Sequence, residues 1–211
     1  MIYNYKDLPD NDNLNQFSYC VNVINKMIIK KGKMIAYYGM LRFEAVGENL
    51  LDLIVQESIN TPRYANEFIT ATGEGKLILG DRACEMASYD LEDAHLTVKA
   101  SRVVAFSPTL TCQESTLGGY LTFLGTGQLI ASSNGPVVFV EAPAKVDPEA
   151  VLGWADLPSP SYHYDYEYIK GVFSAVGSLA GLKQSGEERQ LNFTGKGTIL
   201  IQSSENGQGI N

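Results

Sequence analysis

The chain of 211 residues has few of the side chains on which enzymes and metal sites depend. It contains two histidines and three cysteines, and Cys20, Cys84 and Cys112 lie far apart with no C-x-x-C pair. Widely spaced cysteines in odd number argue against a disulfide framework or zinc knuckle and favour a reducing compartment. We interpret Cys84 and Cys112 as small apolar core residues. With no G-x-S-x-G motif either, we expect no catalytic residues and no cofactor.

Positive charge is also scarce. Sixteen lysines and arginines face 24 acidic residues, which leaves a net charge of −8. A phosphate backbone favours a clustered positive surface, so the composition speaks against nucleic acid as a partner. One basic cluster exists, at Lys26, Lys30, Lys31 and Lys33. We interpret it as a solvated turn, with binding of an anion or a lipid headgroup as the alternative.

Long apolar runs are missing as well. No run approaches the roughly 18 apolar residues of a membrane-spanning helix, so we expect no transmembrane segment. The first residues, MIYNYKDLPDNDN, include three aspartates and no apolar stretch, which is typical of neither a signal nor a transit peptide. From these features we expect a soluble, cytoplasmic protein.

A Gly-x-Gly-x-aliphatic-aliphatic motif, by contrast, occurs three times, as GEGKLILG (73–80), GTGQLIASS (125–133) and GKGTILIQSS (195–204). A Walker loop needs another glycine upstream, and a dinucleotide fingerprint needs a helix after its glycines. Here a β-prone apolar run follows, so we predict a bulge or tight corner at the start of a strand. The predicted structural corners are Gly73, Gly75, Gly125, Gly127, Gly195 and Gly197.

A second motif also occurs three times, as IKKGKMIAY (29–37), VKASRVVAF (98–106) and VDPEAVLGW (146–154). Each copy places two aliphatic residues and a small residue before an aromatic, namely Tyr37, Phe106 or Trp154. We predict turns at 30–33, 99–102 and 147–150 between apolar strands. Because its aromatic follows two core aliphatics, Trp154 should be buried.

The two motifs together predict one domain, 1–211, built from three similar modules. The last copy of the first motif lies near the C-terminus, and the first copy of the second lies near the N-terminus. We therefore predict modules at about 61–113 and 114–160, and a third that joins 187–211 with 17–60. Strand 197–203 would then pair with or pack beside the N-terminal strands. Residues 154–186 would form an insertion, where individual function tends to reside.

A long helix is the alternative for 81–107, which lacks glycine and proline and shows a helical spacing of apolar residues. The segment 130–146 joins equivalent motifs, however, and contains Gly135-Pro136 and Pro143, which exclude a continuous helix. We therefore predict strands and turns in both segments, and an all-β fold.

Three stretches, FTGKGTILIQSS, LGGYLTFLGTGQLIA and KVDPEAVLGW, resemble the family of the altered-inheritance-of-mitochondria protein, whose bacterial members are called tryptophan RNA-binding attenuator-like proteins. The resemblance covers about residues 20–204. It implies an attenuator-like β-sandwich related to the double-stranded β-helix, and a ring-like homo-oligomer, with a trimer as the expected size. It supplies no catalytic residues, because the family has no established activity. Its namesake binds RNA through repeated basic residues that this acidic chain lacks.

The strand-like segment SYHYDYEYIKG (161–171) carries the one candidate metal site, at His163, Asp165 and Glu167. These three side chains would share one face of a strand, with Tyr162, Tyr164, Tyr166 and Tyr168 on the other. Same-face neighbours stand about 6.5–7 Å apart, so three of them do not easily reach one ion. We favour tyrosines packed inward and a solvated acidic face. We interpret His95, beside Glu92 and Asp93, as an ordinary surface or partly buried histidine.

These observations favour a non-enzymatic oligomeric scaffold or binding protein. Two alternatives remain: a membrane-peripheral organiser that uses the insertion 154–186, in which GVFSAVGSLAGLK (171–183) is small and apolar, and a protein that binds a small molecule or metal near His163. The runs 120–130 and 197–203 contain few lysines, and lysines commonly protect exposed sheet edges. We therefore expect contacts between β-edges in a closed homotrimer, with the insertion on one face of the ring.

Overall fold

Antiparallel strands make up most of the computed structural model, which describes residues 5–46, 62–156, 158–164 and 189–204. Helical structure in these residues is limited to single turns, η1 (Tyr5–Asp7), α2 (Pro62–Ala65) and η2 (Ala100–Arg102). The strands are β1 (Asp12–Asn15), β2 (Ser18–Lys30), β3 (Met34–Ala45), β4 (Phe68–Gly80), β5 (Glu85–Lys99), β6 (Val103–Phe106), β7 (Thr111–Glu114), β8 (Tyr120–Ser133), β9 (Val137–Glu141), β10 (Ala144–Val146), β11 (Val151–Ala155), β12 (Ser161–Tyr164), β13 (Arg189–Phe193) and β14 (Thr198–Gln202). The predicted all-β, sandwich-type fold class is confirmed.

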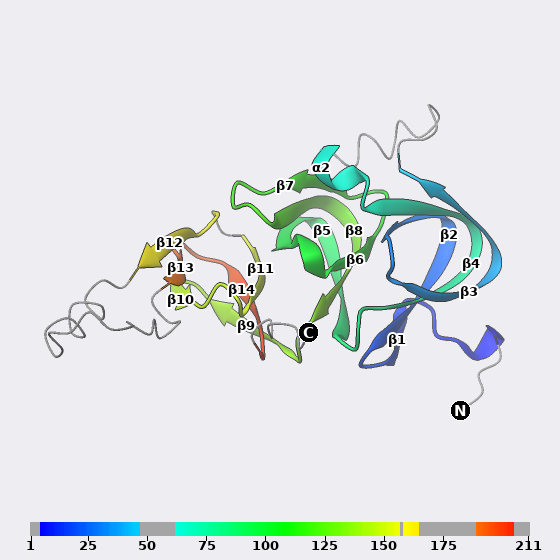
Figure 1. Cartoon of the computed structure of the whole chain (residues 1–211), viewed down its shortest axis with the longest axis horizontal. Coiled ribbons are helices and arrows are strands. Elements are labelled where there is room, and N and C mark those ends of the chain that lie inside the picture. Colours follow the sequence, from blue (N-terminus) through cyan, green and yellow to red (C-terminus); the bar gives the residue numbers. More distant parts are fainter. Residues whose placement is uncertain (1–4, 47–61, 157, 165–188, 205–211) are drawn as a thin grey trace, which may run out of the picture.

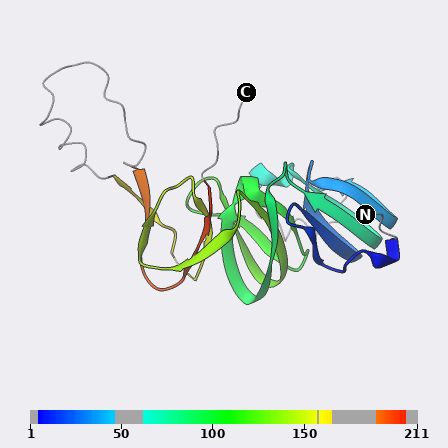
Figure 2. The same ribbon diagram turned by 90° about the horizontal axis from the view of Figure 1, so that it is seen from below.

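One continuous sheet runs through the whole molecule. Its strand order is β3-β4-β2-β6-β8-β5-β11-β14-β9, with β1 paired to β2 and β7 paired to β8. A separate sheet of three strands has the order β10-β13-β12. Figures 1 and 2 show three units in a row, with β2–β4 at one end, β5–β8 in the middle and β9–β14 at the other end. Among the strands that the structure describes, the long sheet therefore ends at β3 and at β9.

The longest strands bend near their middles, at residues with positive φ. In β4 the bend lies at Gly73, with φ of +119°, directly opposite Asn25 of β2, with φ of +76°. A Cβ atom at Gly73 would lie 2.1 Å from the carbonyl oxygen of Met40, so β3 can approach only a glycine here. In β8 the bend lies at Gly125 and Gly127, opposite a bulge in β5.

These positions correct the prediction that each G-x-G turns a corner at the start of a strand. In β4 and β8 the glycines lie inside a strand of 13 or 14 residues, and only in the third motif do they, Gly195 and Gly197, precede their strand, β14. A residue with positive φ bends an extended strand without ending it when the ladder continues on both sides. The motif therefore marks where a long strand bends.

Each copy of the second motif pairs with a copy of the first in the same register. The aromatic residue lies opposite the aliphatic residue that follows G-x-G by two positions. The three pairs are Tyr37 with Leu77 (β3 and β4), Phe106 with Leu129 (β6 and β8) and Trp154 with Ile199 (β11 and β14). The two motifs thus meet at one kind of strand pair in each of the three units.

The predicted module split between the termini is wrong. The C-terminal strand β14 is paired with β11 and β9, whereas the N-terminal strand β3 is paired with β4. Each aromatic motif joins the G-x-G motif that follows it in the sequence, and not the one that precedes it. Strands that follow each other along the chain pair more often than distant ones, because a shorter loop costs less entropy to close.

The predicted turns are confirmed, and so are strands in place of a helix at 81–107. The turn at 30–33 links β2 to β3, and 99–102 links β5 to β6 through η2. Residues 147–150 link β10 to β11. Runs of consecutive buried residues in β2 and β4 are expected of strands that have a paired neighbour on each side.

Three apolar clusters form the core. The largest contains Phe68, Phe106 and Phe123 with residues from all three units, and it includes Leu152 and Leu200. A second cluster joins β2 and β4 to β6 and β8. The third surrounds Trp154 at the other end of the molecule. Trp154 is only 1% exposed, so its predicted burial is confirmed.

Candidate interaction surface

The strand β3 at one end of the sheet exposes a series of large apolar side chains. Met40 is 86% exposed, Ile35 64%, Tyr37 49% and Tyr38 39%. Side chains of this type are normally scattered singly on the surface of a protein, and a group of them marks a contact site. The sequence did not indicate this exposure, because the motif predicts the same apolar strand in all three units.

Cross-strand partners show which face of the sheet Met40 occupies. Glu74 of β4 lies opposite both Met40 of β3 and Ile24 of β2, so the three side chains form one row across the sheet. Ile24 is also exposed, at 67%. The inner face, in contrast, carries Leu41 and Phe43, which pack against the second core cluster. The row with Met40 therefore lies on the outer surface.

The strand β9 at the opposite end of the sheet exposes apolar side chains on both of its faces. Phe139 is 61% exposed and Val138 is 53% exposed. Phe139 lies opposite Leu200, which is buried in the largest core cluster, and Val138 lies opposite Ile201. The apolar rows of the core thus continue to the last strand and remain uncovered there.

The two strands that the sequence suggested as edges are interior strands. β8 is paired with β6 and β5, and β14 is paired with β11 and β9. An absence of lysine is equally expected of a strand with neighbours on both sides, so this signal cannot separate the two cases. The ends of the sheet are β3 and β9.

Both ends also carry an exposed charge. Arg42 lies in β3, two positions after Met40, and Glu141 lies in β9, two positions after Phe139. Neither side chain has an ion-pair partner among the residues that the structure describes. Both end strands therefore carry an exposed apolar residue followed two positions later by a charged one. The charge is positive in β3 and negative in β9.

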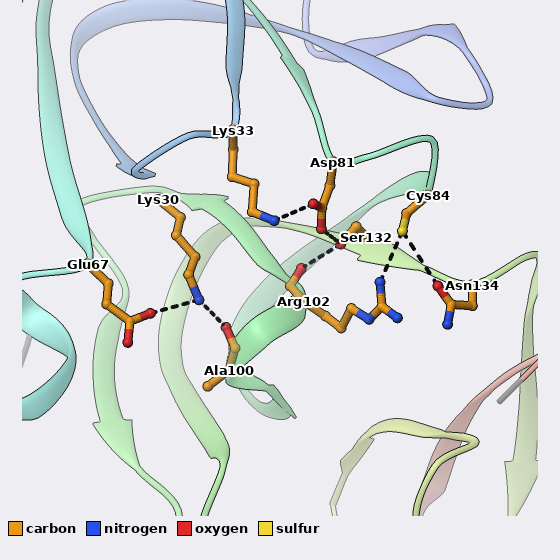
Figure 3. A network of polar contacts seen from close by, with 9 residues as sticks. All are labelled: Lys30, Lys33, Glu67, Asp81, Cys84, Ala100, Arg102, Ser132 and Asn134. Atoms are coloured by element: carbon orange, nitrogen blue, oxygen red, sulfur yellow. Dashed lines mark hydrogen bonds and ion pairs between the residues drawn. The ribbon is translucent and has the colours of Figure 1, made fainter. Parts of the chain in front are cut away.

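A buried polar network lies where the N-terminal unit meets the middle unit (Figure 3). Lys33, from the turn between β2 and β3, forms an ion pair with Asp81, which follows β4. The hydroxyl of Ser132 in β8 donates to the other carboxylate oxygen of Asp81 at 2.5 Å and lies 3.3 Å from the carbonyl oxygen of Arg102. Burial would raise the pKa of Asp81, but hydrogen bonds from Lys33 and Ser132 and nearby positive charge hold it below its ordinary value.

A second ion pair in the same region engages Lys30, another lysine of the basic cluster. The ammonium of Lys30 lies 2.9 Å from a carboxylate oxygen of Glu67 and donates to the carbonyl oxygen of Ala100 at 2.7 Å (Figure 3). Lys30 and Lys33 therefore connect the units, and Lys31 is the one lysine of the turn that is exposed. The arrangement fits a structural turn better than a site for anions.

The cysteines differ from the prediction at one position. Cys112 is buried in the core, and burial raises the pKa of its thiol to about 12. Cys84 is only partly buried, and Arg102 donates to its sulfur with Nη1 at 3.0 Å, while the thiol lies 3.5 Å from Oδ1 of Asn134. Cys84 is therefore a member of the polar network and not an apolar core residue. The reason is that Arg102, the last residue of η2, reaches its sulfur.

The lysine of the first glycine-rich motif is engaged within the fold. Lys76, which follows Gly75, is nearly buried and donates to the carbonyl oxygen of Leu8, with Asp10 at 3.0 Å. Its charge is thus used to hold the N-terminal segment against β4. This agrees with the structural interpretation of the motif.

The candidate metal strand is described only in part. His163 is partly buried in β12, whereas Asp165 and Glu167 lie outside the described residues, as do Tyr166 and Tyr168. Tyr162 is 42% exposed and Tyr164 45%, so the inward packing predicted for the tyrosines is wrong at these two positions. Among the described strands β12 pairs only with β13, and the Tyr162 ring is covered by Arg189, at 4.1 Å from its centroid. In the described part of the chain, no three His, Cys, Asp or Glu residues gather as metal ligands would.

Comparisons with known proteins identify the fold and the family. The family model described as mitochondrial biogenesis AIM24 matches residues 21–204. The crystal structure of a protein from Streptococcus pyogenes is similar with a TM-score of 0.60 and 17% sequence identity, over 92% of each chain. At that identity the likeness concerns the fold alone. No curated protein matches. Within the described residues, no helix has the length and apolar character needed to cross a bilayer.

Proposed function

We propose that this chain, which belongs to the mitochondrial biogenesis AIM24 family, is a non-enzymatic scaffold or binding protein that assembles into a closed homo-oligomer. One observation carries the proposal: both ends of the continuous sheet are strands with exposed large apolar side chains. The trimer implied by the family resemblance is the expected size.

Open edges of this kind demand a partner. An edge strand presents unpaired N–H and C=O groups, and monomeric proteins usually protect it with charge, proline or a covering loop. β9 has one charged residue, Glu141, and β3 is 12 residues long with Arg42 and Glu44 as its only charges. Closed symmetry among identical chains satisfies every edge without leaving a free one.

The alternatives have less support. A metal site near His163 needs Asp165 and Glu167, which lie outside the described residues, and so does the apolar segment 171–183 that a membrane-peripheral role would use. Binding of nucleic acid receives no support from a net charge of −8 or from a basic cluster that is half engaged in ion pairs.

Sedimentation equilibrium tests the proposal. We expect a mass that is a whole multiple of the 23.1 kDa chain at micromolar concentration, with three chains as the expected number. Native mass spectrometry at the same concentration gives an independent count. A chain that stays at 23.1 kDa in both measurements contradicts the proposal.

A further inference from the structure

We infer that β9 of one chain adds to β3 of the next chain as a parallel strand, with Glu141 opposite Arg42. The inference rests on the proposed oligomer and specifies its contact. The contact is head-to-tail, because each chain has two different edges. Each contact joins the β9 edge of one chain to the β3 edge of the next. The first support is that β3 and β9 are the two ends of one sheet, and that each already uses one edge, on β4 and on β14.

Side-chain chemistry fixes the register. With Glu141 opposite Arg42, a parallel alignment places Phe139 opposite Met40 and Val137 opposite Tyr38. Phe139 and Met40 are the most exposed apolar residues of the two strands, at 61% and 86%. Opposite residues of paired strands point to the same face, so all three pairs lie side by side on one surface.

The other face of the joint fits as well. The same alignment places Val138 opposite Gly39, and Val140 opposite Leu41. Gly39 leaves room for the Val138 side chain, which is 53% exposed in the single chain. Leu41 already packs against the second core cluster, so Val140 would extend that apolar surface. Both faces of β9 thus meet apolar surface or open space on β3.

Charge decides the strand direction. An antiparallel alignment that keeps Phe139 opposite Met40 would place Glu141 against Tyr38 and Arg42 against Val137. It would leave both charges at an apolar contact without a partner, which is unfavourable. The parallel alignment pairs them instead, and neither has another ion-pair partner in the described chain.

Cysteine cross-linking tests whether unlike edges meet. Met40→Cys and Phe139→Cys chains are prepared separately, mixed, dissociated and reassociated, and oxidised under mild conditions. We expect a covalent dimer on a non-reducing gel from the mixture and none from either variant alone, because neighbouring Cβ atoms in paired strands suit a disulfide. The wild-type chain, with its three native cysteines, is the control for background oxidation. Cross-linking of Met40→Cys chains with each other overturns the inference, since it shows two β3 edges in contact.

A charge exchange tests the register. Arg42→Glu and Glu141→Arg should each weaken association by about three- to tenfold in sedimentation equilibrium, because each places like charges side by side. The double variant should recover most of the wild-type association. Absence of this rescue rules out the parallel register, since in the antiparallel one the two residues do not meet.

A matched pair of variants separates the edge from the outer face of the sheet. Met40 and Ile24 lie in the same row, but Met40 is on the edge strand and Ile24 is two strands away. Met40→Asp should lower association by at least about tenfold, while Ile24→Asp leaves it unchanged. Thermal unfolding of both variants checks that the fold is intact. If the wild-type chain is an oligomer and neither variant weakens it, the inference fails while the proposed scaffold stands; if the wild-type chain is a monomer, both fail.

Discussion

Tyr37 and Trp154 occupy the same position in two regions of this molecule, yet Tyr37 is 49% exposed and Trp154 only 1%. Both follow two aliphatic residues and a small one, and both lie opposite the aliphatic residue that follows G-x-G. The motif sets the register of a strand pair, which is a local property. It does not set burial.

Burial depends on where the strand lies in the sheet. β11 has β5 on one side and β14 on the other, and Tyr120 and Phe193 pack on Trp154 with ring centroids 4.9 and 5.7 Å away. In the described part of the chain β3 is paired on one side only, and the ring near Tyr37 is that of Phe43, at 5.1 Å. A residue in an end strand loses half of its potential neighbours, and the same aromatic therefore becomes part of a surface.

The largest effect that follows from this comparison is the loss of Trp154. Trp154→Ala removes a fully buried side chain and the centre of the third core cluster, so we expect a loss of about 3–5 kcal/mol in the free energy of unfolding. Urea denaturation followed by circular dichroism measures it. Trp154 is the single tryptophan, so its fluorescence in the native wild-type protein should be blue-shifted. An emission maximum like that of tryptophan in water would contradict the burial on which the comparison depends.

The two regions also differ in what joins them to the middle unit. Both end units pair directly with the middle unit, through β11 with β5 and through β2 with β6, and the N-terminal unit adds the buried network of Lys33, Asp81 and Ser132. Asp81→Asn should cost about 3 kcal/mol, because it leaves the charge of Lys33 nearly buried without its partner. Glu92→Gln, an exposed change in β5, is the control and should stay within about 0.5 kcal/mol.

The contribution of Asp81 to the free energy of unfolding should depend on pH. The pKa of Asp81 is lowered in the folded chain, so its contribution to stability is present above the unfolded pKa of about 4 and is lost as the pH falls through the folded value. The difference between wild type and Asp81→Asn should therefore be full at pH 7, begin to shrink near pH 4 and vanish at lower pH. Urea denaturation across that range measures it; a difference that is equally large at pH 2 contradicts the ion pair as its cause.

Sequence alone was sufficient for the properties that depend on neighbours in the chain. The turns at 30–33, 99–102 and 147–150, the strands on either side of them and the burial of Trp154 all follow from residues close to one another. Sequence alone was not sufficient to choose the partner strands, because every copy of one motif is compatible with every copy of the other. Tyr37 lies 40 positions from Leu77 and 162 from Ile199, and the longer loop costs about 1 kcal/mol more to close. That preference accounts for the partner of Tyr37 but not for that of Trp154, which pairs with Ile199 although Leu129 is nearer in the sequence.

The candidate surface was harder to find for the same reason. Met40 and Phe139 look like core residues in a sequence, because an apolar strand at the end of a sheet has the composition of an interior one. The network around Asp81 has no sequence signal at all, since Ser132 lies 51 positions away. Contacts of this kind can be inferred only once the strand order is known.

The smallest effect concerns Tyr37, and it sharpens the comparison most directly. Tyr37→Ala should cost only about 1 kcal/mol, measured at one fixed chain concentration because association contributes to apparent stability. A double-mutant cycle with Phe43→Ala should give a coupling energy of about 0.5–1 kcal/mol, the value of an edge-to-face pair beyond its buried area. The cycle isolates the contact between the Tyr37 and Phe43 rings in a strand that is paired on one side. A loss for Tyr37→Ala as large as that for Trp154→Ala would mean that the end strand is as well packed as the interior one, and the exposed edge on which the proposed assembly depends would then not exist.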